Sequence, residues 1–417
     1  MIILFLLLRI CFTTKKKSKK MRKVLISIYL STSFLLFGSL AARAGQYDLL
    51  LEEIERNNST LEALRSTREA DRLEARTGLT PDDPSVDLGY LWETKDSQGG
   101  YRIDMSVTQS FDFPSVYYWR KKLSDGALEA ASLRYEQGRK EILLQAEKLC
   151  VELTYFNAFI KALEQGLKTS GELLEKTRLR FECGDASLSE LNGMELAHLS
   201  TMRTLDQNRI ERQGVLDALR TLNGGREISH EISEFSTPML PESFEEWYGM
   251  ASESSSELRI ARNEAENAEK GVSLAKSEWL PKFSLGYVSE RVQGSTLQGI
   301  GGGISIPLWA GRGKVKAAQA RQKAAEQMLE DQKISFFSAM RSKYDKLSAL
   351  SSVCERYGKQ LSGMNSSAAL SDALMAGEIG FADYASGMQL WYNALCELLE
   401  TERDCRLLLC ELEYFAR

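Results

Sequence analysis

Phe111-Asp112-Phe113-Pro114 and Ile304-Ser305-Ile306-Pro307 decide the fold of this chain, because the same pattern surrounds both stretches. Each closes a segment of alternating apolar and polar residues, and a glycine followed by an acid lies 70 positions beyond each proline, at Gly184 and Gly377. The copies are offset by 193 positions here and by 197 positions further upstream. A unit of nearly 200 residues is too long for a solenoid repeat, so we infer the duplication of a whole module.

Four segments of the chain alternate with period two and predict strands in two hairpins. Their apolar positions are Val86, Leu88, Tyr90 and Trp92; Ile103, Met105, Val107 and Phe111; Phe283, Leu285 and Tyr287; and Ile300, Ile304 and Ile306. Polar stretches at 94–101 and 290–298 predict the loops between them. The length of about 9 to 11 residues suits a tilted membrane-spanning strand, although a half-buried sheet in a soluble protein would look similar. Because the smallest single-chain membrane barrels have about eight strands, four spanning strands would require several chains to share one barrel.

The rest of each copy predicts helices. Residues 46–77 and 244–278 favour helix, and about 65 residues without a proline follow both Pro114 and Pro307. A continuous helix of that size would be about 100 Å long. Apolar heptads run along these segments, so Gly184 and Gly377 are predicted as the turns of two long antiparallel helical hairpins. Pro114 and Pro307 are predicted as the strand-to-helix junctions.

The N-terminus has the composition of a secretory signal peptide over residues 1–44, with a basic segment, an apolar segment and a small-residue cleavage site. Met21 is an alternative start, and an uncleaved membrane anchor is the alternative reading of the apolar run. We expect a first repeat at 45–223, a linker at 224–243 and a second repeat at 244–417. Without residues 1–44 the chain has 44 Lys and Arg against 58 Asp and Glu, which disfavours a nucleic-acid partner.

The sequence offers no catalytic, cofactor or metal site. The chain has only two histidines, His198 and His230, and they lie far apart in the sequence. The six cysteines beyond residue 44 form no Cys-x-x-Cys motif, so buried free thiols are expected rather than a disulfide framework or a metal site. The glycines from Gly299 to Gly303 precede another strand segment rather than a helix, so a phosphate-binding loop is disfavoured against a crowded sheet surface.

Taken together, these motifs resemble the TolC-type outer-membrane efflux protein family (outer membrane factors). The resemblance rests on the strands closed by Phe113-Pro114 and Ile306-Pro307, the alanine-rich helices beyond them, the post-turn segments 187–191 and 381–384, and Leu222-Asn223-Gly224. It implies a mainly helical fold in which long antiparallel coiled-coil hairpins form a periplasmic α-barrel. It also implies a homotrimer whose chains each contribute four strands to one twelve-stranded β-barrel in the outer membrane.

The same resemblance implies partners and a gate. The partners are a periplasmic adaptor (membrane fusion) protein, an inner-membrane pump and outer-membrane lipid, with no cofactor and no enzymatic activity. The family's acidic gate positions fall on Glu190 and Asp383, and three Asp383 carboxylates around one axis would attract cations. The alternative is that both acids only offset a helix N-terminal dipole. The family's Tyr and Arg latch positions carry Leu374 and Ile379, which puts the latch in doubt.

Three functions fit these patterns. The first is a passive outer-membrane exit channel of a tripartite efflux pump, with the transported substrate left open. The second is the outer-membrane component of a heavy-metal cation efflux system. The third is a periplasmic coiled-coil scaffold or adaptor, which would explain the heptads but not the four alternating strands.

Overall fold

The computed structural model describes residues 47–92, 100–228, 234–235, 243–292, 294–309, 311–363 and 366–416. The predicted signal peptide (1–44), the alternative start at Met21 and most of the predicted linker (224–243) lie outside the described residues, as does His230. Contacts within the chain define two units, residues 1–52 and 53–417. Apart from the bounds of the first described helix, only the second unit is considered below.

The described elements form two modules of the same order. The first module consists of helices α3 (Asp48–Asn57) and α4 (Ser59–Glu74), strands β1 (Ser85–Trp92) and β2 (Tyr101–Phe111), and helices α5 (Pro114–Glu182) and α6 (Leu188–Leu222). The second consists of α7 (Phe244–Ser254), α8 (Ser256–Ser277), β3 (Lys282–Val292), β4 (Ser295–Ser305), α9 (Lys314–Ser362), α10 (Ser366–Ala376) and α11 (Phe381–Ala416). The predicted fold class, mainly helical with four strands, is confirmed.

The four strands form one antiparallel sheet in the order β1-β2-β3-β4. The register places Val107 opposite Val86 on one side and opposite Tyr287 on the other, so the predicted apolar positions share one face. The loop predicted at 290–298 is wrong in extent, because Glu290 pairs with Leu297 inside the β3–β4 ladder. Gly294, with φ of +92°, lies in the short connection that allows both strands to continue to this point.

Each predicted N-terminal helix is broken once, at equivalent positions of the two copies. Asn58 separates α3 from α4, and its side chain accepts a hydrogen bond from the Leu61 amide. Ser255 separates α7 from α8 and accepts in the same way from Leu258. These residues are N-caps of a second helix, so the ranges 46–77 and 244–278 that favour helix each contain two helices.

The returning helix of each copy ends on the corresponding helix break. Asn58 Nδ2 donates to the Leu222 carbonyl over 2.8 Å in the first copy, and Ser254 Oγ donates to the Phe415 carbonyl over 2.6 Å in the second. Carbonyls of a last helical turn lack partners within the helix, so these side chains satisfy groups that would otherwise be unbonded. The two copies therefore resemble each other even in the hydrogen bonds that cap the ends of α6 and α11.

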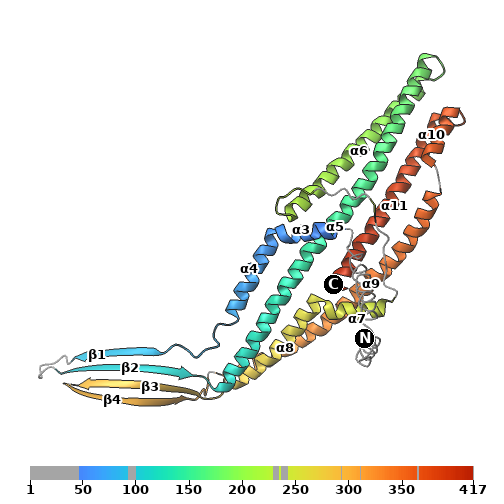
Figure 1. The fold of residues 1–417 in the computed structure, drawn as a ribbon. Coiled ribbons are helices and arrows are strands. Elements are labelled where there is room, and N and C mark those ends of the chain that lie inside the picture. The colour runs from blue at the N-terminus through green and yellow to red at the C-terminus, as the bar shows by residue number, and fades with distance from the viewer. Residues whose placement is uncertain are drawn as a thin grey trace, which may run out of the picture. The chain divides into compact units, whose positions relative to one another are not determined.

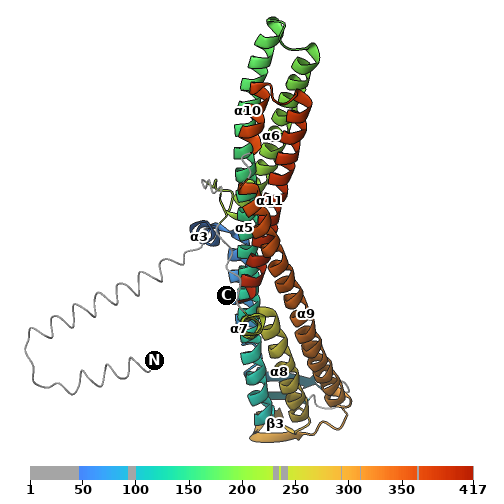
Figure 2. The same cartoon turned by 90° about the vertical axis from the view of Figure 1, so that its right-hand side faces the viewer.

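The long helix of the first copy agrees with its predicted length, whereas that of the second copy does not. Helix α5 has 69 residues, which corresponds to about 100 Å. Helix α9 begins only at Lys314 and ends at Ser362, before the separate helix α10. Each glycine turn lies 70 residues after the proline of its copy, but the two helical hairpins differ in length. The α5–α6 turn extends beyond the α10–α11 turn in both views (Figures 1 and 2). None of the described helices is apolar over a stretch long enough to cross a membrane.

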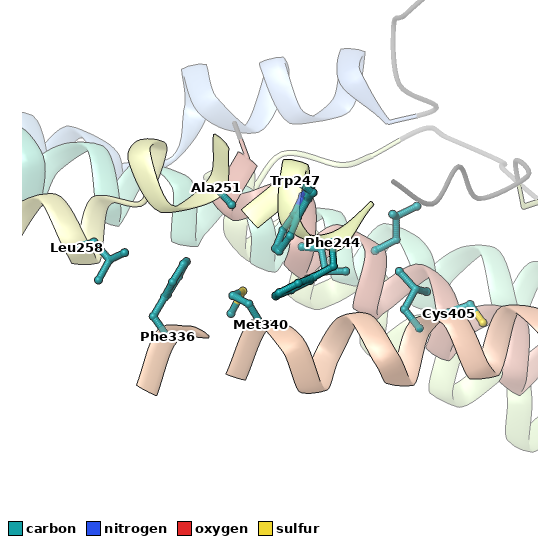
Figure 3. Packing of buried hydrophobic residues seen from close by; sticks show 10 residues of the cluster. Phe244, Trp247, Ala251, Leu258, Phe336, Met340 and Cys405 are labelled. Carbon is teal, nitrogen blue, oxygen red and sulfur yellow. The ribbon is translucent and has the colours of Figure 1, made fainter. Parts of the chain in front are cut away.

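Buried side chains join the helices of the second copy into one core. The cluster consists of Phe244, Trp247, Ala251, Leu258, Phe336, Met340, Leu347, Cys405, Leu409 and Leu412. Figure 3 shows Phe244 and Trp247 of α7 beside Met340 and Phe336 of α9. Aromatic packing in this core orients α7 across α9 and α11, with the Phe244 and Tyr344 rings 5.4 Å apart.

Helix α11 is held against the first hairpin by side chains that enter glycine notches. A Cβ atom at Gly166 of α5 would collide with the hydroxyl of Tyr392, and one at Gly193 of α6 would collide with the Phe381 ring. Tyr392 also packs beside a buried cluster that contains Phe159 and Leu399. The absence of a side chain at these two glycines thus lets α11 lie close to α5 and α6.

The notch at Gly166 can be tested by substitution. Gly166→Ala should destabilise the fold by about 1–3 kcal/mol, because Tyr392 or α11 must move to admit the new methyl group. The control is Gly214→Ala on α6, where no atom lies within 4 Å of the added Cβ and the gain in helix propensity should stabilise by about 0.5–1 kcal/mol. Apparent melting temperatures of the detergent-solubilised full chain measure both effects. Equal stabilisation by the two substitutions would contradict the notch.

Candidate functional site

One face of the β1–β4 sheet is apolar and uncovered. Its exposed side chains are Val86, Leu88, Tyr90, Trp92, Tyr101, Ile103, Met105, Phe111, Phe283, Leu285, Tyr287, Ile300 and Ile304. Aromatic rings gather near one end of β1 and β2, where Tyr90 stacks on Tyr101 at 6.3 Å. Soluble monomers rarely expose a continuous apolar surface of this extent, so this face is built to contact something other than water.

The opposite face of the sheet is mostly small and polar, and its exposed apolar exceptions are Leu91, Val288, Val292 and Leu297. Glycines at Gly89, Gly286, Gly299, Gly301 and Gly303 share it with polar residues, according to the register. Residues 299–303 continue β4 as a strand, which agrees with the sequence analysis in disfavouring a phosphate-binding loop. The outer edges of the sheet are also unpaired, since β1 and β4 each have a neighbouring strand on one side only.

A charged cluster lies on the polar face, and the sequence analysis did not find it. Arg102 Nε lies 2.8 Å from Asp104 Oδ1 and 3.1 Å from Glu290 Oε1. Asp104 and Glu290 come from different repeats and are cross-strand partners in the β2–β3 pairing. Two carboxylates against one guanidinium leave this part of the polar face negatively charged.

The first strand-to-helix junction is fixed by a carboxylate. Pro114 is the first residue of α5, where its missing amide hydrogen costs nothing. Asp112 lies just before it with its side chain 8% exposed, and its two oxygens lie 2.8 Å from Arg120 Nη2 and 2.8 Å from Lys282 Nζ. Burial alone would raise the pKa of Asp112, but the bonds from Lys282 and Arg120 outweigh it and hold the pKa below its usual value. This carboxylate ties the two copies together at the point where the sheet meets the helices.

The second junction is built differently. Pro307 follows β4, but helix α9 does not begin until Lys314, after Gly313 in a left-handed conformation with φ of +87°. Gly311 is packed against the Trp279 indole so closely that a Cβ atom would collide with it. Lys314 Nζ then forms an ion pair of 3.0 Å with Glu278 at the end of α8. The helix predicted to follow Pro307 directly is therefore wrong, because α9 begins only at Lys314, with Gly313 as its N-cap.

The two predicted hairpin turns lie at the far ends of the helices from the sheet (Figure 1). Gly184 follows α5 with φ of +80°, and Gly377 follows α10 with φ of +74°. Only glycine adopts these angles without strain. Both residues cap the preceding helix, because the amides of Asp185 and Glu378 return to carbonyls of its last turn.

The two candidate gate acids occupy the first turns of the returning helices. Glu190 is engaged in a capping box with Ser187, whose amide donates to the Glu190 carboxylate over 2.9 Å while the Ser187 hydroxyl accepts from the Glu190 amide over 3.2 Å. Asp383 is exposed in the first turn of α11. Glu190 thus has a structural role within the chain. The structure of one chain does not bring the two carboxylates together.

An apolar cluster occupies the expected latch region. Leu374 and Ile379 pack with partly buried neighbours against the buried side chains of Leu173, Met194 and Tyr384. These contacts join α10 and α11 to α5 and α6 close to the hairpin turns. Burial raises the pKa of the Tyr384 hydroxyl above its usual value. Within one chain the hairpins are thus joined here by apolar packing.

His198 has a side-chain partner on the neighbouring helix. Its Nδ1 lies 2.9 Å from the Ser170 hydroxyl, which also donates to the Leu167 carbonyl over 3.0 Å. Which of the two groups donates depends on the tautomer of His198. The contact joins α5 to α6.

The described cysteines are free thiols. Burial raises the pKa of Cys150 to about 12 and that of Cys405 to about 11, so both remain protonated and unreactive at neutral pH. Cys183, in contrast, is exposed, so the expectation of buried thiols does not hold for it. Among the described residues no group of three or more His, Cys, Asp and Glu side chains could hold a metal ion.

The junction carboxylate gives a pH-dependent prediction. Asp112→Asn should destabilise the chain by about 1–3 kcal/mol at pH 7, because charge-assisted bonds to Arg120 and Lys282 are lost. A depressed folded-state pKa stabilises the fold above the unfolded pKa, and this contribution disappears as the pH falls through the folded value. The difference in melting temperature between the two proteins should therefore shrink below about pH 4. Asp125→Asn is the control, because Asp125 is an exposed carboxylate near the start of α5. A difference that does not change with pH would contradict the role of the Asp112 charge.

Comparison with solved structures shows which proteins have a similar fold. No protein-family model matches the chain, and no curated protein matches it. Solved structures match over most of their length. The CmeC outer membrane channel of Campylobacter jejuni is similar with a TM-score of 0.70 and 15% identity, over 89% of this chain and 86% of that chain. The outer-membrane channel OprN is similar with a TM-score of 0.74 and 16% identity, over 88% and 89%. The outer membrane protein VceC of Vibrio cholerae is similar with a TM-score of 0.72 and 16% identity, over 89% and 96%. The chain therefore has the fold of these outer-membrane channels.

Proposed function

We propose that the chain forms the outer-membrane exit channel of a tripartite efflux pump and conducts its cargo passively to the exterior. In this proposal three copies share one twelve-stranded barrel in the outer membrane, and their helices form a tunnel in the periplasm. A periplasmic adaptor (membrane fusion) protein and an inner-membrane pump deliver the cargo and supply the energy. The signal peptide at 1–44 and the repeats at 45–223 and 244–417 belong to the same proposal.

The observation that carries this proposal is the uncovered apolar face of the sheet. Strands β2, β3 and β4 each have 11 residues and β1 has 8, which is close to the length that a tilted strand needs to cross the hydrocarbon core. Lipid would cover the apolar face, and the polar face with Gly299 and Arg102 would line a water-filled lumen. The free edges of β1 and β4 need partner strands, because unpaired backbone groups are costly in a membrane.

The alternatives receive less support from the same observations. A periplasmic scaffold would leave the apolar face of the sheet in water, which is unfavourable at about 25 cal/mol per Å² of apolar surface. A heavy-metal system is not favoured over the general channel, since the described residues show no cluster suited to a metal ion. A passive channel needs no catalytic group, and the fold is shared with channels rather than with enzymes.

The function can be tested on the full chain. After expression with its N-terminal segment, the protein should fractionate with outer-membrane markers and require detergent for extraction. The purified protein should then form long-lived conducting pores in planar lipid bilayers, since the sheet faces fit a lipid-facing wall around water. Release with soluble periplasmic proteins, or membranes that stay non-conducting at high protein density, would overturn the channel.

Asp383 is proposed as the gate carboxylate at the end of the tunnel. Asp383→Asn should lower the preference of the pore for cations over anions without changing the melting temperature, because the side chain is exposed and a ring of negative charge would be removed. Reversal potentials in a salt gradient measure this preference.

Two matched variants separate the gate from other effects of charge. Glu378→Gln removes an exposed carboxylate at the neighbouring turn and should leave selectivity nearly unchanged. Glu190→Gln removes a charge but keeps an acceptor for the capping box, so any loss of selectivity would reflect its charge alone. Unchanged selectivity in Asp383→Asn would remove this residue from the gate.

A further inference from the structure

The β3–β4 hairpin interrupts the apolar face of the sheet near its connecting turn. Beyond Tyr287, the register places Ser289 opposite Gln298 on this face, and then Arg291 opposite Thr296. Arg291, Thr296 and Gln298 are exposed, and Ser289 is half-buried. These four residues are called the donor patch, because each side chain has an N–H or O–H group that can donate a hydrogen bond.

The neighbouring strands remain apolar in the same rows of the sheet. The β2 and β1 residues in the rows of Ser289 and Arg291 are Met105, Leu88, Ile103 and Tyr90. All four are exposed apolar side chains, and in the proposed channel lipid covers them. The donor patch adjoins this surface without a break, so the same lipid reaches it.

Arg291 is the only charged side chain on the apolar face of the four described strands. The nearest carboxylates in the sheet, Asp104 and Glu290, lie on the opposite face, where they bind Arg102. Among the described residues Arg291 has no ion-pair partner. An arginine on a lipid-facing strand is strongly unfavourable at the middle of a membrane but tolerated near its surface. Arg291 is therefore expected at the level of the lipid headgroups.

The position of the hairpin places the donor patch on the outer side of the membrane. Strand β3 follows α8 and β4 leads towards α9, so their connection at Gly294 lies at the end of the sheet away from the helices (Figure 1). In the proposed channel the helices are in the periplasm, which assigns this end of the sheet to the outer leaflet. The aromatic rings of Tyr90, Trp92 and Tyr101 gather near the same end, as in the aromatic girdle at a membrane interface.

The donor patch is suited to an anion. The Tyr287 hydroxyl donates to Gln298 Oε1 over 2.7 Å, which occupies the amide oxygen and leaves the amide hydrogens free to donate. The planar guanidinium of Arg291 matches two oxygens of one phosphate. Donors that face lipid without an acceptor are unfavourable. One positive charge among several donors, with no carboxylate on this face, thus fits a phosphate better than a neutral group or a cation.

We propose that the donor patch binds the phosphate of a lipid headgroup in the outer leaflet. Arg291 forms two parallel bonds to the phosphate, and the Gln298 amide donates a further one. The inference rests on the proposed channel, because it requires the apolar face of the sheet to lie against lipid. A lipid is the occupant, rather than a free anion, because the patch is continuous with the apolar side chains of Leu88 and Met105, over which the acyl chains would lie.

Native mass spectrometry of the detergent-purified full chain, titrated with dioleoyl phosphatidate, tests the site. The chain should bind this lipid more tightly than dioleoyl phosphatidylcholine, in which the choline group offsets the phosphate charge. Arg291→Gln should weaken phosphatidate binding by about tenfold or more, because charge-assisted hydrogen bonds are lost. Gln298→Leu keeps the charge and should weaken binding by about threefold. Arg102→Gln removes the same charge from the opposite face and, as the control, should leave phosphatidate binding unchanged.

Each outcome bears on the proposal. Equal affinity for the two lipids would overturn it, and so would unchanged phosphatidate binding in Arg291→Gln. Equal weakening by Arg102→Gln would also overturn it, because the effect would then come from total charge. Displacement of phosphatidate by inorganic phosphate would reveal a site for a free anion instead of a lipid. Conductance without selective lipid binding would reject the site but keep the channel, whereas selective binding without conductance would reject the channel but keep the site.

Discussion

The apolar face of the β1–β4 sheet is the constraint on which the rest of the structure depends. Its side chains, from Val86 in β1 to Ile304 in β4, cannot be buried by the chain itself. In the proposed channel, lipid would cover the apolar face, and strands of further copies would pair with the open edges of β1 and β4. The long helices then lie beyond one end of this sheet, and Asp112 fixes the corner by joining Arg120 of α5 to Lys282 of β3.

The helical hairpins of the two copies differ in length, although the proline and the turn glycine are equally far apart in both sequences. Helix α5 begins at Pro114, whereas α9 begins at Lys314 and not at the equivalent Pro307, so α9 starts later by a length of about 10 Å. The α5–α6 turn consequently lies beyond the α10–α11 turn (Figure 2). Glu190 and Asp383 are thus carried by hairpins of different length, and Glu190 already serves a capping box. Unequal hairpins favour Asp383 over Glu190 as the more independent charge at the tips.

Much of this architecture could be predicted from local patterns, because strand alternation, apolar heptads and glycine turns each depend on residues that are close together in the sequence. The positions of Gly184 and Gly377 are examples, since a left-handed turn between two apolar heptads leaves a local signal. The capping box of Ser187 and Glu190 was also readable at its spacing of three residues. Contacts between distant segments left no such signal. Nothing near Asp112 indicates Lys282, and nothing near Gly166 indicates Tyr392, because only the folded chain brings them together.

The two returning helices present different side chains at equivalent positions of the two copies. Tyr392 and Phe381 of α11 are large rings whose apolar area is hidden in the glycine notches of Gly166 and Gly193. Leu199 and Leu188, which lie 193 positions earlier on α6, are smaller and exposed. Smaller side chains limit the apolar area that an exposed helix presents to water, which lowers the risk of aggregation. Duplication therefore provided one packing solution, and divergence placed its aromatic version within the chain and its aliphatic version on the surface.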